Sequence, residues 1–403
     1  MRYARTLLAT AGAGVLVILI WNLWAIEPSY KGHHLSEWLE LYGAAYNGYL
    51  YTTNTWATKE DTEDAIRRIG YRRAIPFMLR WIQSVPISHR AIIEANQGQP
   101  VAVVREMLNG FDQEEFRAEG SAAAFRVLGS NAISALPELT RIASVPPNPD
   151  WGVHDPAWGL ECPSMPNRRA IFALANIGPA AIPSLLNLAT NQSTDIQCDA
   201  VYLISRMGTN AMPAIPLMLH DIKNPANRVA YMAARSLGTL KLSPETVISA
   251  LTNALEHRRA LPTTYWTNGT DPQLFFYNYA FASIAAYGAE ARPALPTLLA
   301  WLNKDEDPFL PEKAADALGK LALEPEIVVP ALTKALGSRN PELVCSAAQS
   351  LGDYGPSATS AVPALIRVFD TKGLIWHDRH LVGLALKQIT NSAPAPVSGL
   401  QAE

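Results

Sequence analysis

The chain repeats one short unit eight times, and this repeat constrains the fold more than any other feature. Each unit is an alanine-rich helical stretch followed by a glycine and, soon after, a proline. The glycines are Gly70, Gly129, Gly178, Gly208, Gly238, Gly288, Gly319 and Gly352. Four of the intervals between them measure 30, 30, 31 and 33 residues, and three longer ones measure 59, 49 and 50. Such a period is typical of repeat architectures, in which each unit packs on its neighbours.

One face of the helix before each glycine is uniformly uncharged. The positions 8, 5, 4 and 1 residues before a glycine share a helix face. None of these 32 positions is charged, although 17% of the chain is charged. We therefore predict that this face is buried in all eight units.

The glycine and the proline predict where the helices end and begin. A glycine can adopt the left-handed conformation of a helix C-cap, so we expect each of the eight glycines to end a helix. A proline is favoured at the start of the next helix. The link between them reads, for example, Gly288-Ala-Glu-Ala-Arg-Pro-Ala-Leu-Pro296. Two helices per unit predict an all-α fold, a right-handed α-solenoid of about eight helix pairs.

This unit, with its Ala-x-x-Ala-Leu-Pro link, resembles the HEAT repeat in its short bacterial, PBS-lyase-like form. The resemblance covers residues 62–370, with weaker half-units at each end, and we assign residues 62–390 to the solenoid. The segment Tyr30-Lys-Gly-His-His-Leu-Ser-Glu-Trp-Leu39 is similar to one in membrane-anchored bacterial HEAT-repeat proteins, with Ser36 expected as an N-cap. The resemblance implies an interaction scaffold, and it transfers no catalytic residues.

The first 26 residues have the pattern of a membrane anchor. Arg2 and Arg5 precede the uncharged run 6–26, whose 21 residues would span roughly 31 Å as a helix, and Trp21 and Trp24 lie near its far end. We expect a signal-anchor helix with a cytoplasmic tip (residues 1–5), a capping region (27–61) and a solenoid on the extracytoplasmic, periplasmic side. A cleaved signal peptide, which would leave a secreted protein, and a buried helix are the alternatives.

The long intervals predict insertions into the solenoid. Residues 84–119 have the pattern of a degenerate repeat, whereas residues 145–163 and 257–277 are aromatic-rich and each follow the second helix of a unit. Loops that depart from a repeat period often carry binding residues. The candidate partner-binding residues are Trp151, His154, Trp158, Tyr265, Trp266 and Trp376. In the alternative interpretation the loops cover helix ends and bury their aromatic rings, and Phe275 to Tyr277 are expected to be core.

Composition and motifs argue against several classes of function. Lys and Arg number 33 against 36 Asp and Glu, a net charge of −3, which argues against a general nucleic-acid binder. No nucleophile elbow, zinc-protease motif, phosphate loop or dinucleotide fingerprint occurs. Two clusters, one of His154, Asp155, Glu161 and Cys162 and one of His377 and His380, each lack four good zinc ligands. We therefore expect neither a metal nor a cofactor, and we expect Cys198 and Cys345 to be buried thiols.

These observations favour a membrane-anchored scaffold that binds a protein or peptide partner, without catalysis and without nucleic acid. Two alternatives remain. The aromatic insertions could hold a small molecule, chromophore or glycan in a lyase-like manner, or they could contain an enzyme active site. We expect the tail, residues 391–403, to be disordered, and the oligomeric state is left open.

Overall fold

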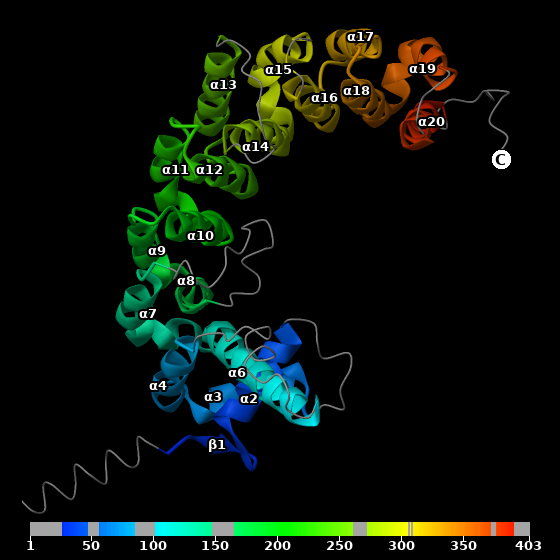
Figure 1. Ribbon diagram of the computed structural model, residues 1–403. Helices are drawn as coiled ribbons and strands as arrows, with labels where there is room; N and C mark the ends of the chain where they lie inside the picture. Colours follow the sequence, from blue (N-terminus) through cyan, green and yellow to red (C-terminus); the bar gives the residue numbers. More distant parts are fainter. Residues whose placement is uncertain are drawn as a thin grey trace, which may run out of the picture. The chain divides into compact units, whose positions relative to one another are not determined.

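The computed structural model describes residues 26–46, 56–84, 101–146, 165–260, 272–304, 307, 309–371 and 376–390. The chain divides into two compact units, Met1–Met207 and Gly208–Glu403. Apart from one two-stranded hairpin, the regular structure of the described residues is helical (Figure 1). Unit 1 contains β1 (Ser29–Tyr30), β2 (His33–His34), α2 (Leu35–Tyr46), α3 (Lys59–Ile69), α4 (Tyr71–Ile82), α6 (Val101–Leu128), α7 (Leu136–Ala143), α8 (Pro166–Ile177), α9 (Ile182–Leu188) and α10 (Thr194–Ser205).

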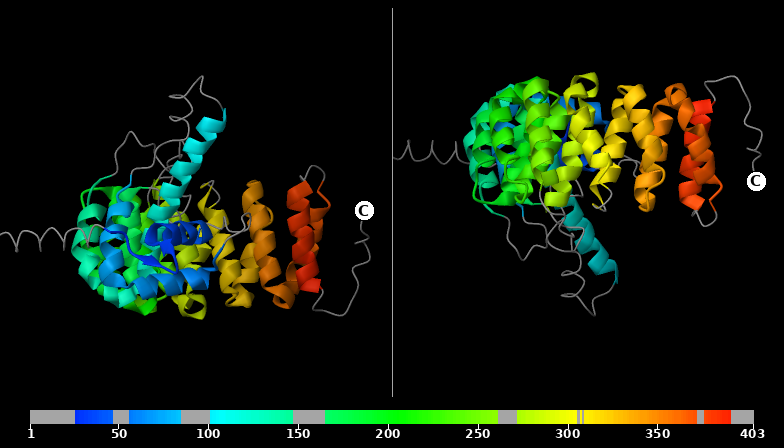
Figure 2. Two further views of the ribbon diagram at one scale, coloured as in Figure 1. Left: turned by 90° about the horizontal axis from the view of Figure 1, so that it is seen from below. Right: turned by 90° about the horizontal axis from the view of Figure 1, so that it is seen from above.

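Unit 2 consists of helix pairs arranged in two layers. Its helices are α11 (Ile215–Asp221), α12 (Arg228–Leu240), α13 (Pro244–Ala260), α14 (Pro272–Ala286), α15 (Leu295–Leu302), α16 (Leu310–Leu321), α17 (Pro325–Ala335), α18 (Pro341–Asp353), α19 (Val362–Phe369) and α20 (Trp376–Thr390). The odd-numbered helices form one layer and the even-numbered helices the other (Figure 1), and the later helices of the unit stand side by side in Figure 2. Short 3₁₀ turns connect α14 to α15 (η7, Gly288–Ala294) and α18 to α19 (η8, Gly355–Ala361), and a third, η6 (Gly208–Ala214), precedes α11.

The structure confirms the predicted buried face. Of the 32 positions counted from the eight glycines, all except the partly exposed Met207 are buried. Ala233 and Ala234, for example, are 0% exposed. Alanine at these positions lets neighbouring helices of one layer approach closely. The two-layered, solenoid-like arrangement within each unit therefore follows directly from the repeat.

The predicted role of the glycines is confirmed at five positions and wrong at three. A left-handed φ occurs at Gly70, Gly129, Gly178, Gly208 and Gly288. By contrast, Gly238, Gly319 and Gly352 lie inside α12, α16 and α18. They are points of close helix packing, because a Cβ atom on Gly238 or Gly319 would overlap the serine of the next helix in the layer, and one on Gly352 would lie 3.1 Å from the Cα atom of Ala385.

Helices α12 and α16 end without glycine. Their C-caps are Lys241 (φ 51°) and Ala322 (φ 48°), and two residues later Ser243 (φ 49°) and Glu324 (φ 47°) are left-handed as well. Left-handed backbone is unfavourable for residues with a Cβ atom, so neighbouring contacts must hold these two turns in place.

The N-terminal hairpin caps helix α2. Strands β1 and β2 pair antiparallel, and Lys31 (φ 51°) and Gly32 (φ 85°) at the turn between them both have the positive φ that a type I′ turn requires. The Trp38 indole is 2% exposed and donates to the Tyr30 carbonyl oxygen at 3.3 Å. The prediction that Ser36 is the N-cap is wrong, because α2 already begins at Leu35. Residues 30–39, the segment that is similar to one in bacterial HEAT-repeat proteins, thus have a structural role in this chain.

Helices α2 and α6 cross at two glycines. A Cβ atom on Gly43 would lie 2.8 Å from the Phe116 carbonyl carbon and 3.0 Å from the Gly120 nitrogen, and it would overlap the Phe116 carbonyl oxygen. A Cβ atom on Gly120 would overlap the Leu39 carbonyl oxygen in the same way. The crossing is backbone against backbone, and it joins the capping helix to the long helix α6, which begins inside the predicted degenerate repeat and ends at Leu128.

Several predictions fall on other parts of the chain. The predicted anchor, residues 6–26 with Arg2, Arg5, Trp21 and Trp24 at or near its ends, lies outside the described residues except for Ile26. None of the helices in the described ranges is long and apolar enough to span a membrane. Cys198 and Cys345 are buried thiols as predicted, whereas Cys162 is outside the described residues.

Candidate functional site

The predicted partner-binding residues stay predictions. Trp151, His154, Trp158, Tyr265 and Trp266 lie outside the described residues. Trp376 is the first residue of α20, and its side chain is outside the described part as well.

The end of the second insertion leads into an aromatic surface that lies within the description. In α14, Phe276 and Tyr277 are buried as expected for core residues, but Phe275 is 40% exposed. The prediction that Phe275 is core is wrong, because it lies four residues before the partly exposed Tyr279 on the outward face of the helix. The neighbouring helix α12 presents Tyr231 and Arg235, also four residues apart.

These four side chains form what we call the aromatic–arginine surface: Tyr231, Arg235, Phe275 and Tyr279. The Tyr231 ring lies 6.0 Å from the Tyr279 ring, stacked with an interplanar angle of 19°, and 5.9 Å from the Phe275 ring. The Arg235 guanidinium lies 5.6 Å from the centre of the Tyr279 ring. The side chains of the two helices thus alternate in the order Phe275, Tyr231, Tyr279 and Arg235. They form a partly exposed row of aromatic groups with a cation at one end.

Close packing of α12 on α14 positions this surface. Ser283 of α14 lies against Gly238 of α12, and its hydroxyl donates to the Ala234 carbonyl oxygen at 2.7 Å. The absence of a side chain on Gly238 brings the two helices together, so Tyr231 and Tyr279 come within stacking distance. Unit 1 has a pair of the same kind on α10, where the Arg206 guanidinium lies 6.0 Å from the Tyr202 ring and donates to its hydroxyl at 3.1 Å.

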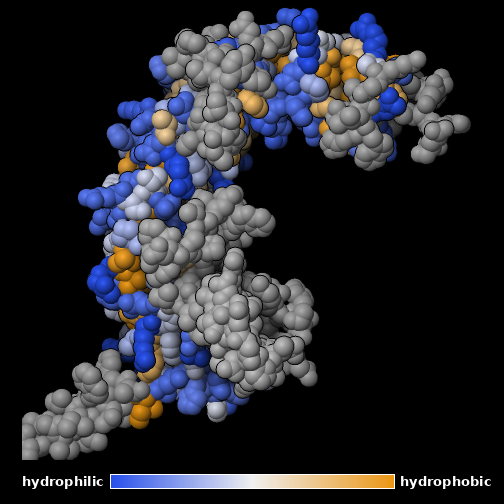
Figure 3. Space-filling view, viewed as in Figure 1, coloured by the Kyte–Doolittle hydropathy of each residue, from blue (hydrophilic) through white to orange (hydrophobic). Residues whose placement is uncertain are grey.

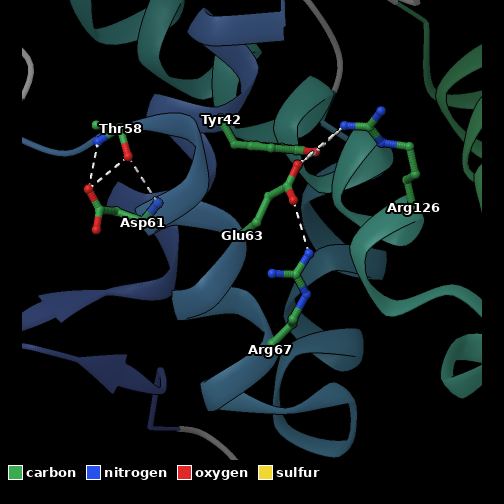
Figure 4. A network of polar contacts seen from close by, with 6 residues as sticks. All are labelled: Tyr42, Thr58, Asp61, Glu63, Arg67 and Arg126. Carbon is green, nitrogen blue, oxygen red and sulfur yellow. Dashed lines mark hydrogen bonds and ion pairs between the residues drawn. The ribbon is translucent and has the colours of Figure 1, made fainter.

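A second group of polar residues lies in the N-terminal part of unit 1 (Figure 4). The Glu63 carboxylate accepts from Arg67 at 3.0 Å, from Arg126 at 3.4 Å and from the Tyr42 hydroxyl at 3.3 Å. Arg126 also donates to the Tyr42 oxygen at 2.9 Å. Burial raises the pKa of Tyr42, and the hydrogen bond from Arg126 partly offsets that rise. The network joins α2, α3 and α6. Two guanidinium groups and a phenol donate hydrogen bonds to the Glu63 carboxylate, so the network offers no free base.

Close to this network an aromatic cluster covers the start of α2. The His33 ring stacks on Trp56 at 3.7 Å with an interplanar angle of 13°, and Trp56 contacts Trp38 edge-on at 4.5 Å. His33 Nδ1 lies 3.1 Å from the Glu37 carboxylate. Trp56 is 50% exposed, so this cluster also presents an aromatic group at the surface.

The described residues contain no group of three or more His, Cys, Asp and Glu side chains arranged to hold a metal ion. The first candidate cluster from the sequence, His154, Asp155, Glu161 and Cys162, lies outside the described residues. In the second cluster the side chain of His377 is outside the described part as well, and His380 is exposed.

A simple sequence signal indicates the aromatic–arginine surface. Tyr231 with Arg235, Phe275 with Tyr279 and Tyr202 with Arg206 are all i, i+4 pairs. These aromatic residues lie outside both the uncharged helix face and the insertions, the two features on which the sequence predictions rest.

Comparison with known proteins identifies the repeat class. Residues 295–375 match the family model of HEAT repeats, and residues 167–191 match that of the PBS lyase HEAT-like repeat. These matches confirm that the chain contains HEAT repeats. No curated protein sequence matches the chain.

Solved structures that are similar to this chain include a karyopherin, phycocyanin lyase subunits and a hydroxylase. The karyopherin Kap121p bound to the extreme C-terminus of the protein phosphatase Cdc14p is 14% identical, with 90% of this chain and 45% of the karyopherin covered and a TM-score of 0.47. The CpcE and CpcF complex of phycocyanin lyase from Nostoc sp. PCC7120 is 20% identical, with 61% and 98% covered and a TM-score of 0.34. Human deoxyhypusine hydroxylase is 18% identical, with 66% and 99% covered and a TM-score of 0.24. The chain thus spans less than half of the length of the karyopherin.

Proposed function

We propose that the chain is a HEAT-repeat scaffold that binds a protein or peptide partner, without catalysis, on the aromatic–arginine surface of α12 and α14. The observation that carries this proposal is the row of the exposed Phe275 and the partly exposed Tyr231 and Tyr279, whose rings contact one another, with Arg235 at its end. Tyrosine and arginine are enriched among the residues that contribute most to protein interfaces. The rigid aromatic rings also lose little conformational entropy on binding.

The arrangement of the surface favours an extended partner. It crosses two adjacent helices of one layer, and the helices are fixed by the Gly238 and Ser283 contact. A partner segment that lies across the layer would contact successive rings and reach the Arg235 guanidinium, which is suited to a carboxylate. Because the surface is already formed, binding would cost little reorganisation.

A photo-crosslinking experiment tests this function. A photoreactive amino acid at Ala282, an exposed position seven residues after Phe275 on α14, should capture a specific partner in the native cell. The control position is Asn253, which is exposed on α13 in the other layer. Capture at Ala282 should be lost in a Tyr231→Ala, Phe275→Ala variant that keeps its helix content. The same proteins captured at both positions, or capture unaffected by the double variant, would rule out this surface.

Membrane attachment is the second part of the proposal. The uncharged run 6–26, with Arg2 and Arg5 before it, would hold the scaffold on the extracytoplasmic, periplasmic side. The support is the sequence pattern alone. Deleting residues 1–26 should release the protein from carbonate-washed membranes, and a protease added outside spheroplasts should digest the full chain. Retention of the shortened chain in the membrane fraction would contradict the anchor.

A further inference from the structure

A cavity lies in the C-terminal part of unit 2, far in sequence from α12 and α14. It has a volume of about 260 Å³ and lies between the connection from α17 to α18 and the helices α19 and α20. Its apolar wall includes Leu336, Val344, Val368 and Val382. Figure 3 shows hydrophobic residues at the surface between α18 and α19, in the upper right of the view. The cavity opens to solvent, so a group from outside can enter it.

One side of the cavity carries hydrogen-bond donors. Arg339 and Ser338 belong to its lining and lie in the connection between α17 and α18. Arg339 is exposed and, among the residues that the structure describes, it has no ion-pair partner. The Ser338 oxygen accepts from the Asn340 amide at 3.1 Å, which leaves the hydroxyl hydrogen able to donate.

A second cation lies near the cavity but outside its lining. Arg379 of α20 donates to the carbonyl oxygen of Thr371, a lining residue, at 3.4 Å. Among the residues that the structure describes, no aspartate or glutamate lines the cavity. The acidic side chains nearest in sequence, Glu342 and Asp370, are exposed and lie outside the lining. The cavity thus combines an apolar interior with one cation, Arg339, in its lining.

Size and charge together define the group that fits. Sites for drug-sized ligands have volumes of roughly 300–1,000 Å³, so this cavity suits a single apolar side chain better than a cofactor. An anion bound by Arg339 and Ser338 would have to lie directly beside that side chain. In a polypeptide, the carboxyl-terminal residue has a carboxylate and a side chain on the same carbon atom, and capture of such termini is a known mode of peptide recognition.

We infer that this cavity binds the carboxyl-terminal residue of a partner polypeptide when that residue is apolar, with its side chain among the valines and its carboxylate at Arg339 and Ser338. The site is separate from the aromatic–arginine surface and does not depend on it. The long part of the partner would leave through the open side of the cavity. The carboxylate–guanidinium contact is charge-assisted, so it should dominate the affinity.

The inference can be tested with the full chain and two synthetic peptides. A fluorescein-labelled hexapeptide ending in leucine is prepared as the free acid and as the carboxamide, and binding is followed by fluorescence anisotropy. We expect the acid to bind at least about tenfold more tightly than the amide. Arg339→Gln should remove that preference, whereas Arg367→Gln, an exposed arginine of α19 outside the lining, should preserve it.

Cys345 provides a second measurement that reports on the cavity itself. Cys345 belongs to the lining and is 8% exposed. The acid peptide should slow alkylation of Cys345 by N-ethylmaleimide, measured by mass spectrometry, and the amide should not. Cys198 in unit 1 is the internal control, because its slow reaction should be the same with either peptide.

Three results would overturn the inference. The first is equal binding of the acid and amide peptides, and the second is an unchanged preference for the acid in Arg339→Gln. The third is protection of Cys345 from alkylation by hexanoate at the same concentration at which the acid peptide protects it. The last would mean that the cavity recognises a hydrophobic carboxylate without any peptide. The Tyr231→Ala, Phe275→Ala variant should bind the acid peptide normally, so failure of the proposed function and failure of this inference give different results.

Discussion

The hydroxyl group of Tyr354 lies 2.6 Å from the main-chain carbonyl oxygen of Leu323 and donates a hydrogen bond to it. Leu323 lies between the left-handed residues Ala322 and Glu324 in the turn after α16. Tyr287 has the same relationship with Leu242, at 2.9 Å, in the turn after α12. In both cases a tyrosine at the end of the next helix in the layer holds a glycine-free turn in place.

Removing the Tyr354 hydroxyl should destabilise unit 2. The Tyr354→Phe variant leaves the Leu323 carbonyl without this donor and weakens the support of two unfavourable backbone conformations, at a cost of about 1–2 kcal/mol in the free energy of unfolding. Urea denaturation followed by circular dichroism measures this loss. Tyr279→Phe on the partly exposed face is the control and should unfold near the parent midpoint. Equal midpoints for Tyr354→Phe and the parent would contradict a supporting role.

The same tyrosines predict a loss of stability in alkali. Burial raises the pKa of Tyr287 to about 12, from an unfolded value of about 10. The unfolded chain therefore loses this proton first as the pH rises. The stabilisation is complete below about pH 10 and is lost as the pH rises through about 12. Burial raises the pKa of Tyr354 in the same direction. The free energy of unfolding should fall less steeply between these pH values in Tyr287→Phe than in the parent, and equal slopes would exclude this contribution.

The crossing of α2 and α6 should not tolerate any side chain. Gly43→Ala and Gly120→Ala each place a methyl group on the backbone of the other helix, so we expect a loss of at least about 2 kcal/mol, or failure to fold. Gly383→Ala in α20 is the matched control. Its methyl group would lie 3.4 Å from the Phe369 ring, an ordinary contact, and helix propensity favours alanine. Thermal unfolding of the three variants separates these effects. A Gly43→Ala protein as stable as Gly383→Ala would refute the close crossing.

Arg169 should be essential for the stability of unit 1. It is 1% exposed and donates to the Ser84 carbonyl oxygen at 2.6 Å, just after α4. Burial lowers the pKa of its guanidinium, and the charges of Glu119 and Glu115 oppose that shift. Arg169→Ala leaves buried polar groups without this partner and should cost about 3 kcal/mol. Arg80→Ala, at an exposed position in the last turn of α4, should have little effect on the urea midpoint. Similar midpoints for the two variants would be inconsistent with the buried contact.

The candidate sites were predicted less well than the fold. The buried face of each repeat and the two-helix unit followed from charge patterning, because burial excludes charge at every turn of a helix wherever the helix packs. The partner-binding residues chosen from the insertions lie outside the described residues. The aromatic–arginine surface was missed because Tyr231 and Phe275 are far apart in the sequence, and nothing local to either residue predicts that they meet.

The eight glycines separate the contribution of the sequence from that of the tertiary structure. The sequence determined their period, and hence a chain of helix pairs with one buried face, because periodicity is a local property. It could not distinguish Gly288, whose left-handed φ ends a helix, from Gly319, which continues one. That difference depends on Ser350, which lies against Gly319 from the next helix of the layer. Only the packed structure decides where a missing side chain serves a turn and where it serves a contact, because a contact needs both helices.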